Sequence, residues 1–186
     1  MGVSASGLAA LLLLAVLAWP GAASAQAPAD KCAACHLETG DERLAAPVKA
    51  FDGDIHKAKG FGCVGCHGGD AKADGPEAMS PAKGFVGKPS RQQIVQFCGR
   101  CHSDAAFMKR YNPSMRVHQE QEYYSSAHGK KLKAGDQKVA TCISCHSVHN
   151  IRPIKDQQAW TYPVQVAETC ARCHADAKYM EGRKVP

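Results

Sequence analysis

The 186-residue sequence has little of several features that mark common protein classes. Aromatic residues make up only 6% of the chain and the Lys and Arg residues are scattered, so nothing supports a nucleic-acid-binding surface. Alternation of apolar and polar residues is weak throughout, which argues against strands. The longest apolar run covers about 12 residues, well short of the roughly 20 that span a membrane. We therefore expect a mainly α chain with extensive loops and almost no β-sheet.

Cysteine occurs ten times and never outside one short motif. The motif is C-x-x-C-H, and it is present in five copies that we number 1 to 5 in chain order. Its cysteines are Cys32, Cys35, Cys63, Cys66, Cys98, Cys101, Cys142, Cys145, Cys170 and Cys173. The histidines that follow each pair directly are His36, His67, His102, His146 and His174.

This motif is the attachment signature of c-type haem. Two thiols add to the vinyl groups of the porphyrin, and the adjacent imidazole becomes the proximal iron ligand. Repeated C-x-x-C pairs also build zinc ribbons and redox dithiols, which are the alternatives. A histidine directly after all five pairs favours haem over both. The sequence thus predicts five covalently attached haem c groups, haem 1 to haem 5.

The start of the chain has the pattern of an export signal. The first charged side chain is Asp30, and before it an apolar run over residues 8–19 leads to the small-residue sequence ASA at 23–25. This predicts a secretory signal peptide over residues 1–25 and a periplasmic protein with no stable membrane span after cleavage. No Lys or Arg precedes the run, so an uncleaved anchor is the alternative.

Residues 26–186 are expected to form one pentahaem cytochrome c domain. At about 32 residues per haem, the peptide cannot build an ordinary apolar core, so the haems would supply most of the buried surface. The chain without haem should then be largely unfolded, as small metal-dependent domains are without their metal.

An internal repeat divides this domain further. Residues 98–108 read CGRCHSDAAFM and residues 170–180 read CARCHADAKYM. Each copy follows a motif with a histidine upstream, His56 before motif 2 and His128 before motif 4. We therefore expect a haem 1 segment at 26–55 and two dihaem units at 56–112 and 113–186.

Local patterns predict a few short helices. One is expected over residues 42–49, and another opens at a Ser90–Gln93 capping box and enters motif 3, with Tyr111 as its furthest extent. A third is expected over 120–127, ended by Gly129. Residues 68–90 should form a loop, and a second, solvated loop should carry Lys130, Lys131 and Lys133.

Distal iron ligands must come from outside the motifs. Four histidines remain for five positions, and a methionine in a flexible segment is the best candidate for the fifth. The candidates are His56, His118, His128, His149 and Met79. Met108 and Met180 occupy matching repeat positions, which favours helix packing for them. Haem 1 lies outside the repeat and is expected to be the haem without a distal histidine. Its iron then has a methionine ligand, is open, or is capped by another subunit.

From residue 97 to residue 180 the sequence resembles the periplasmic multihaem c-type cytochromes of anaerobic and metal-respiring bacteria. The segments that carry the resemblance are FCGRCH, YSSAHG, CISCHSVHNIRP and TCARCHAD, with DIHKAKGFGCVGCHGG at 54–69 in the same pattern. The resemblance implies that His128 and His149 are distal ligands in a closely spaced haem chain. It also implies redox partners: a membrane quinol dehydrogenase as donor, and a terminal reductase or outer-membrane cytochrome as acceptor.

The leading functional prediction is an electron carrier with no catalytic residues and no nucleic-acid partner. Iron with two histidine ligands is coordinatively saturated, so it changes oxidation state without binding substrate. One alternative is a small reductase of a nitrogen or sulfur oxyanion at a single open haem. Another is a haem-bearing subunit of a larger complex, whose neighbour completes the missing ligand.

Overall fold

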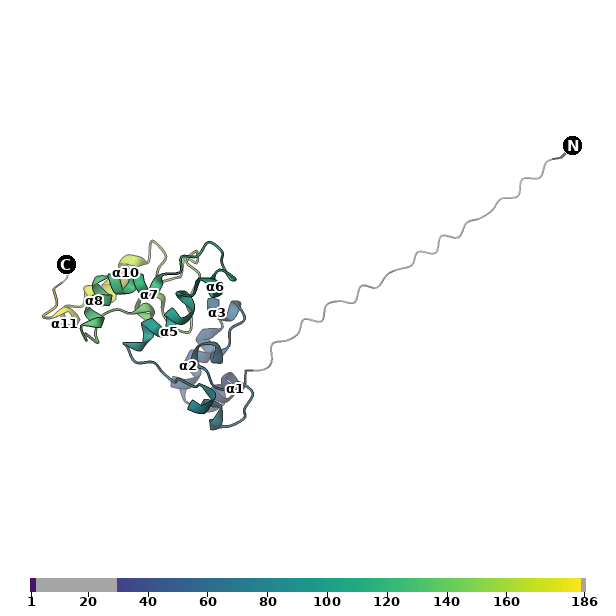
Figure 1. The fold of residues 1–186 in the computed structure, drawn as a ribbon, viewed down its shortest axis with the longest axis horizontal. Helices are drawn as coiled ribbons and strands as arrows, with labels where there is room; N and C mark the ends of the chain where they lie inside the picture. The colour runs from purple at the N-terminus through teal and green to yellow at the C-terminus, as the bar shows by residue number, and fades with distance from the viewer. Residues whose placement is uncertain (3–29, 185–186) are drawn as a thin grey trace.

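The computed structural model describes residues 1–2 and 30–184 of the chain (Figure 1). Residues 3–25 of the predicted signal peptide lie outside this part. Short helices and loops make up the described chain, which contains no strand, so the predicted fold class is confirmed. None of its helices is long and apolar enough to cross a membrane.

The helices are short, and five of them contain the C-x-x-C-H motifs. The α-helices are α1 (Lys31–Glu38), α2 (Glu42–Phe51), α3 (Ile55–Ala58), α4 (Cys63–His67), α5 (Gln93–His102), α6 (Ala105–Met108), α7 (Gln119–Ser125), α8 (Ala127–Lys133), α9 (Cys142–His146), α10 (Val166–His174) and α11 (Ala177–Met180). Two 3-10 turns, η1 (Pro76–Met79) and η2 (Pro81–Lys83), interrupt the predicted loop at 68–90.

The two ends of the described chain lie at opposite ends of the molecule, with α5 between them. Figure 1 shows α1 and α2 at one end, and α8 and α11 at the other. Helix α5 contacts α7 and α9, and α7 packs on α8. Arg100 of α5 also donates a hydrogen bond to the Cys66 carbonyl of α4 (2.7 Å), so α5 joins the segments of motifs 2 and 4.

The apolar core is small, as the ratio of chain to motifs predicts. One cluster of buried side chains consists of Val95, Leu132 and Val139, with Tyr123 and Tyr124 packed against it. Val95 is the largest side chain that is completely buried in the described part. So little peptide core leaves room for another group to supply buried apolar surface.

Several local expectations hold and others are wrong. Helix α2 confirms the helix expected over 42–49. The helix of motif 3 stops at His102 and does not reach Tyr111, because the Asp104 side chain accepts a hydrogen bond from the Phe107 amide (2.9 Å) and starts α6. Asp176 caps α11 in the same way through the Tyr179 amide (2.9 Å).

The helix expected over 120–127 is split in two. Helix α7 ends at Ser125, and Ser126 caps α8 by accepting a hydrogen bond from the Gly129 amide (3.1 Å). Gly129 lies inside α8 and does not end a helix; a Cβ there would stand 2.1 Å from the Tyr123 carbonyl oxygen, so glycine allows the close approach of α7. The three lysines that follow are exposed, but on α8 rather than on a loop.

Candidate haem-binding site

Each C-x-x-C-H motif lies on a helix: α1, α4, α5, α9 and α10 in chain order. Helical geometry explains the spacing, because residues three and four apart share one face, so both thiols and the imidazole project to the same side. All ten cysteines are free thiols. The motifs therefore fit the covalent attachment of haem.

The zinc alternative requires four Cys or His ligands around one point. Among the described residues, no three His, Cys, Asp or Glu side chains converge in a way that could hold a metal ion. Among the described residues, the C-x-x-C pairs therefore do not converge into the four-ligand knuckles of a zinc ribbon.

Three histidines outside the motifs lie opposite motif histidines. The ring centroids are 5.9 Å apart for His56 and His102, with perpendicular planes. They are 6.1 Å apart for His67 and His149, with an interplanar angle of 25°. They are 6.0 Å apart for His128 and His174, at 61°.

This common spacing fits two imidazoles on opposite sides of one metal. With metal–nitrogen bonds of about 2 Å, trans imidazole ligands place their ring centroids roughly 6 Å apart. The structure therefore brings His56, His128 and His149 beside the histidines of motifs 3, 5 and 2, respectively.

The other candidates are not brought to a motif histidine. In the described chain, no second histidine ring packs beside His36 or His146. His118 is exposed and lines a surface cavity of about 560 Å³ with Glu120, Tyr124 and Lys133. Met79 is 42% exposed in η1. Of the two repeat methionines expected to pack in helices, Met108 is buried and Met180 is half-buried.

Consecutive motifs lie side by side in chain order. Burial and then the neighbouring Cys101 raise the pKa of Cys66, and a hydrogen bond with Cys142 raises the pKa of Cys98. Burial and then Cys170 raise the pKa of Cys145. Thiols influence one another in this way only when they are close, so motif 2 adjoins motif 3, motif 3 adjoins motif 4, and motif 4 adjoins motif 5.

Motifs 1 and 2 are joined by a single carboxylate. Asp30 accepts a hydrogen bond from the Cys32 amide (3.1 Å) through one oxygen and from the Cys63 amide (3.1 Å) through the other. Burial acts to raise the pKa of Asp30, but these hydrogen bonds together outweigh it and lower the pKa. Burial, followed by the charge of Asp30, raises the pKa of the Cys63 thiol to about 12.

Two of the paired histidines have a fixed tautomer. The Nδ1 of His67 lies 2.9 Å from the Gly87 carbonyl oxygen, which can only accept, so Nδ1 carries the proton. The Nδ1 of His56 donates to the Asp54 carboxylate (2.8 Å) for the same reason. In a neutral imidazole whose proton is on Nδ1, Nε2 is the acceptor and is able to bind a metal.

Asp54 is the most buried carboxylate of the site, 3% exposed. Burial acts to raise its pKa, but hydrogen bonds from the His56 side chain, the His56 amide and the Ile151 amide outweigh burial and lower it. Sequence analysis missed both Asp30 and Asp54. The only available signal was a helix-capping Asp placed two residues before Cys32 and His56.

The matching arginines of the repeat occupy similar places. Arg100 of motif 3 donates to the Cys66 carbonyl of motif 2 (2.7 Å). Arg172 of motif 5 packs over the Trp160 ring (3.6 Å from its centroid), and its charge acts on Cys145 of motif 4. Each arginine therefore stands beside the second cysteine of the preceding motif.

The loop that carries His149 is strained. Ser147 and His149 have φ angles of 65° and 62°, a left-handed conformation that residues other than glycine rarely adopt. Gly68 stands in the same place after motif 2, with φ 68° and ψ −158°, against φ 65° and ψ −168° for Ser147. Strain of this kind persists where the surrounding structure holds it, often at functional sites.

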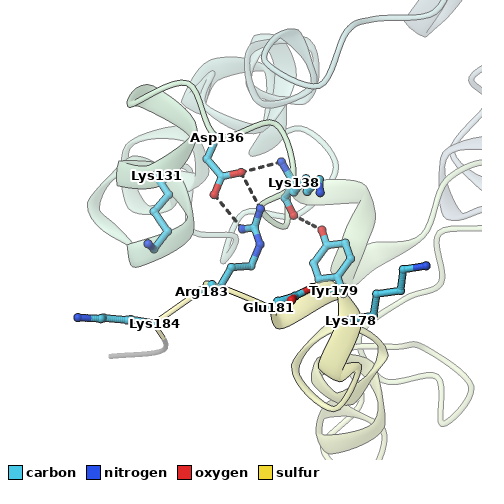
Figure 2. A pocket seen from close by; sticks show the side chains of 9 residues that line it. Lys131, Asp136, Lys138, Lys178, Tyr179, Glu181, Arg183 and Lys184 are labelled. Carbon is cyan, nitrogen blue, oxygen red and sulfur yellow. Dashed lines mark hydrogen bonds and ion pairs between the residues drawn. The ribbon is translucent and has the colours of Figure 1, made fainter.

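A basic surface cavity of about 570 Å³ adjoins α11, the helix that follows motif 5 (Figure 2). Asp136 accepts hydrogen bonds from both Nη atoms of Arg183 (2.8 and 3.1 Å), and Tyr179 donates to the Lys138 carbonyl. These contacts join the C-terminal segment to the loop after α8. The remaining charges of the lining are mostly positive: Lys131, Lys138, Lys178 and Lys184, against Glu181.

Similarity to known proteins agrees with haem as the group that the motifs hold. Over 168 residues the chain is 26% identical to the C-type polyheme cytochrome OmcC of Geobacter sulfurreducens. The match covers 77% of this chain but only 20% of OmcC, so the chain spans about a fifth of that relative's length. No protein-family model and no solved structure matches the chain. The chain is thus a distant homologue of a C-type polyheme cytochrome.

Proposed function

We propose that this protein is a periplasmic electron-transfer protein with five covalently attached c-type haems. The observation that carries the proposal is the set of three histidine pairs, each joining a motif histidine to one outside the motifs at 5.9 to 6.1 Å. Haem iron supplies a one-electron couple when bound. The paired imidazoles would saturate that iron and so exclude substrate from it.

The adjacency of consecutive motifs supports transfer along the chain. The Cys66–Cys101, Cys98–Cys142 and Cys145–Cys170 neighbours bring motifs 2 to 5 together, and Asp30 links motifs 1 and 2. Electrons would then enter and leave near motifs 1 and 5, at opposite ends of the molecule in Figure 1.

The proposed partners are a membrane quinol dehydrogenase as donor and a terminal reductase or outer-membrane cytochrome as acceptor. The basic cavity beside motif 5 supports an acidic docking surface on one of them (Figure 2). Charge complementarity of this kind accelerates encounter and weakens with salt. Electron-transfer rates with the physiological partner should therefore fall as ionic strength rises. The rates should be lower still in a Lys138→Glu, Lys178→Glu variant.

Intact mass and a pyridine haemochrome assay of the exported protein test the haem count. The proposal requires five haem additions and a fully reversible reduction. Replacing both cysteines of motif 5, Cys170→Ala and Cys173→Ala, should remove one haem and leave four. Free thiols in the exported protein, or bound zinc in place of haem, would refute the proposal.

One observation favours a second candidate, a reductase with an open iron. His36 and His146 have no histidine partner among the described residues, and Met79 is exposed. Carbon monoxide binding to the reduced protein separates the two functions. Stoichiometric binding, with turnover of nitrite or sulfite, would favour the reductase; absence of binding would favour the carrier.

A further inference from the structure

We infer that Asp54 is a positioning residue for two iron-ligating histidines at once, orienting His56 and holding the loop of His149, and that it lowers the reduction potential of haem 3. The inference rests on the proposed function, because it takes both histidines as distal ligands. It concerns a side chain that no haem-attachment motif contains.

The contact with His56 sets the orientation of the imidazole. One carboxylate oxygen of Asp54 accepts from the Nδ1 of His56 (2.8 Å) and from the His56 amide (2.8 Å). The Asp54 side chain is almost completely buried and that of His56 is 27% exposed, so water competes little for these bonds. The ring is held by its Nδ1, and Nε2 remains for the metal shared with His102.

The other carboxylate oxygen reaches across the molecule. It accepts from the Ile151 amide (2.7 Å), and the Ile55 amide donates to the Ile151 carbonyl (2.8 Å). Ile151 follows the left-handed residue His149 by two positions, and the His149 ring stands 6.1 Å from that of His67. Asp54 therefore ties the segment of one distal ligand to the segment of another.

A carboxylate on the outer nitrogen of a ligating imidazole raises the basicity of the ligand. A more basic ligand and a nearby negative charge both stabilise ferric over ferrous iron. Hydrogen bonding of this kind is one of the means by which a protein sets a haem potential. Asp54 should act most strongly on haem 3 through His56 and more weakly on haem 2 through the His149 loop.

The repeat contains a natural comparison. His128 is the repeat counterpart of His56, and the residue two positions before it is Ser126. The Ser126 hydroxyl accepts from the Gly129 amide (3.1 Å) and donates to the Tyr123 carbonyl (2.6 Å), so it is engaged in capping α8. It carries no charge. Haem 3 should consequently have a lower potential than haem 5.

The test uses holoprotein matured in the periplasm and followed by spectroelectrochemistry. Asp54→Asn keeps the shape but removes the charge, and its amide group must face either Nδ1 of His56 or the Ile151 amide. The potential of haem 3 should rise most and that of haem 2 less; a tenfold loss of ferric over ferrous stabilisation equals a rise of about 59 mV for a one-electron couple. Asp54→Glu should restore most of the wild-type value.

The matched control is Asp52→Asn. Asp52 is exposed, lies two residues away and pairs with Lys57 at the surface, so its loss should leave all potentials unchanged. Unchanged potentials in Asp54→Asn, with all five haems attached and the low-spin haems of the wild type retained, would overturn the inference but leave the proposed function in place. A wild-type protein without haem would instead refute the proposed function.

A gain-of-charge variant decides the question if Asp54→Asn does not mature. Ser126→Asp places a carboxylate at the counterpart position, where Asp also serves as a helix cap. The potential of haem 5 should then fall toward that of haem 3. A rise, or no change, in all five potentials would contradict the proposed role of the carboxylate.

Discussion

The two halves of the repeat hold equivalent histidines by different means. His56 stands opposite His102 and His128 stands opposite His174, at almost the same ring distance. His56 is fixed by a buried carboxylate that also holds Ile151, whereas His128 follows a serine engaged in a helix cap. The placement of the ligand pair is thus common to both halves, and its electrostatic setting is not.

This difference separates the residues that attach and ligate a haem from the residues that adjust its reduction potential. The first depends on a helix that presents two thiols and an imidazole, with a second imidazole opposite. The second depends on single side chains such as Asp54, which lie outside the attachment motif. Changes at the matching positions should therefore have unequal effects in the two halves.

The largest effect is expected from removing the paired histidines themselves. His56→Ala and His128→Ala should each convert one low-spin haem to high-spin, which electron paramagnetic resonance detects. His56→Ala also removes the strongest hydrogen-bond partner of the buried Asp54 carboxylate. The unfolding free energy of His56→Ala should therefore fall by about 1–3 kcal/mol more than that of His128→Ala. Equal losses in thermal or denaturant unfolding would break the distinction between the halves.

Removing the capping side chains should have the next largest effect. Ser126→Ala should lower the unfolding free energy by about 1 kcal/mol, the usual cost of a lost cap. Asp54→Ala leaves the amides of His56 and Ile151 without their partner and should lower it by roughly 3 kcal/mol. Urea unfolding of the two holoproteins measures both values, and a smaller loss for Asp54→Ala would contradict the structure.

The residue that follows each of the paired histidines His56 and His128 gives a smaller contrast. A Cβ at Gly129 would stand 2.1 Å from the Tyr123 carbonyl, so Gly129→Ala should destabilise the protein by about 1–3 kcal/mol. Lys57, the counterpart after His56, is exposed, and Lys57→Ala should change stability by no more than about 0.5 kcal/mol. Melting temperatures of the pair check this, and similar shifts would show that α8 tolerates a side chain there.

The smallest effect is expected from relieving the backbone strain where motif 4 ends. Ser147→Gly should relieve left-handed strain and raise the unfolding free energy by about 1 kcal/mol. Loss of the hydrogen bond from Ser147 to Asn150 (2.5 Å) subtracts from this gain. The reverse change, Gly68→Ser, should destabilise, because a Cβ there would meet the Gly84 carbonyl oxygen at 2.0 Å. A destabilised Ser147→Gly protein would mean that the serine hydroxyl outweighs the strain.

The sequence predicted part of the local structure. The helix expected over 42–49 is present as α2, and weak alternation correctly predicted the lack of strands in the described chain. The breaks after His102 and inside 120–127 were missed, because Asp104 and Ser126 act as caps in the middle of patterns that otherwise continue as helix.

The contacts that set the candidate site could not be predicted. Spacing identified His56, His128 and His149 as candidates but not their partners, since His149 reaches back from motif 4 to His67 of motif 2. The bond from Asp54 to Ile151 joins residues far apart in the chain, and no local pattern carries that information. The division into a haem 1 segment and two dihaem units stays a prediction.

The most direct test is the number and type of low-spin haems in the oxidised holoprotein, measured by electron paramagnetic resonance with a parallel haem count. At least three centres should be low-spin with two histidine ligands. Near-parallel imidazole planes split the iron orbitals that share the unpaired electron, and perpendicular planes do not, so the His67–His149 pair at 25° should give a more rhombic signal than the perpendicular His56–His102 pair. Fewer than three bis-histidine haems would contradict the account.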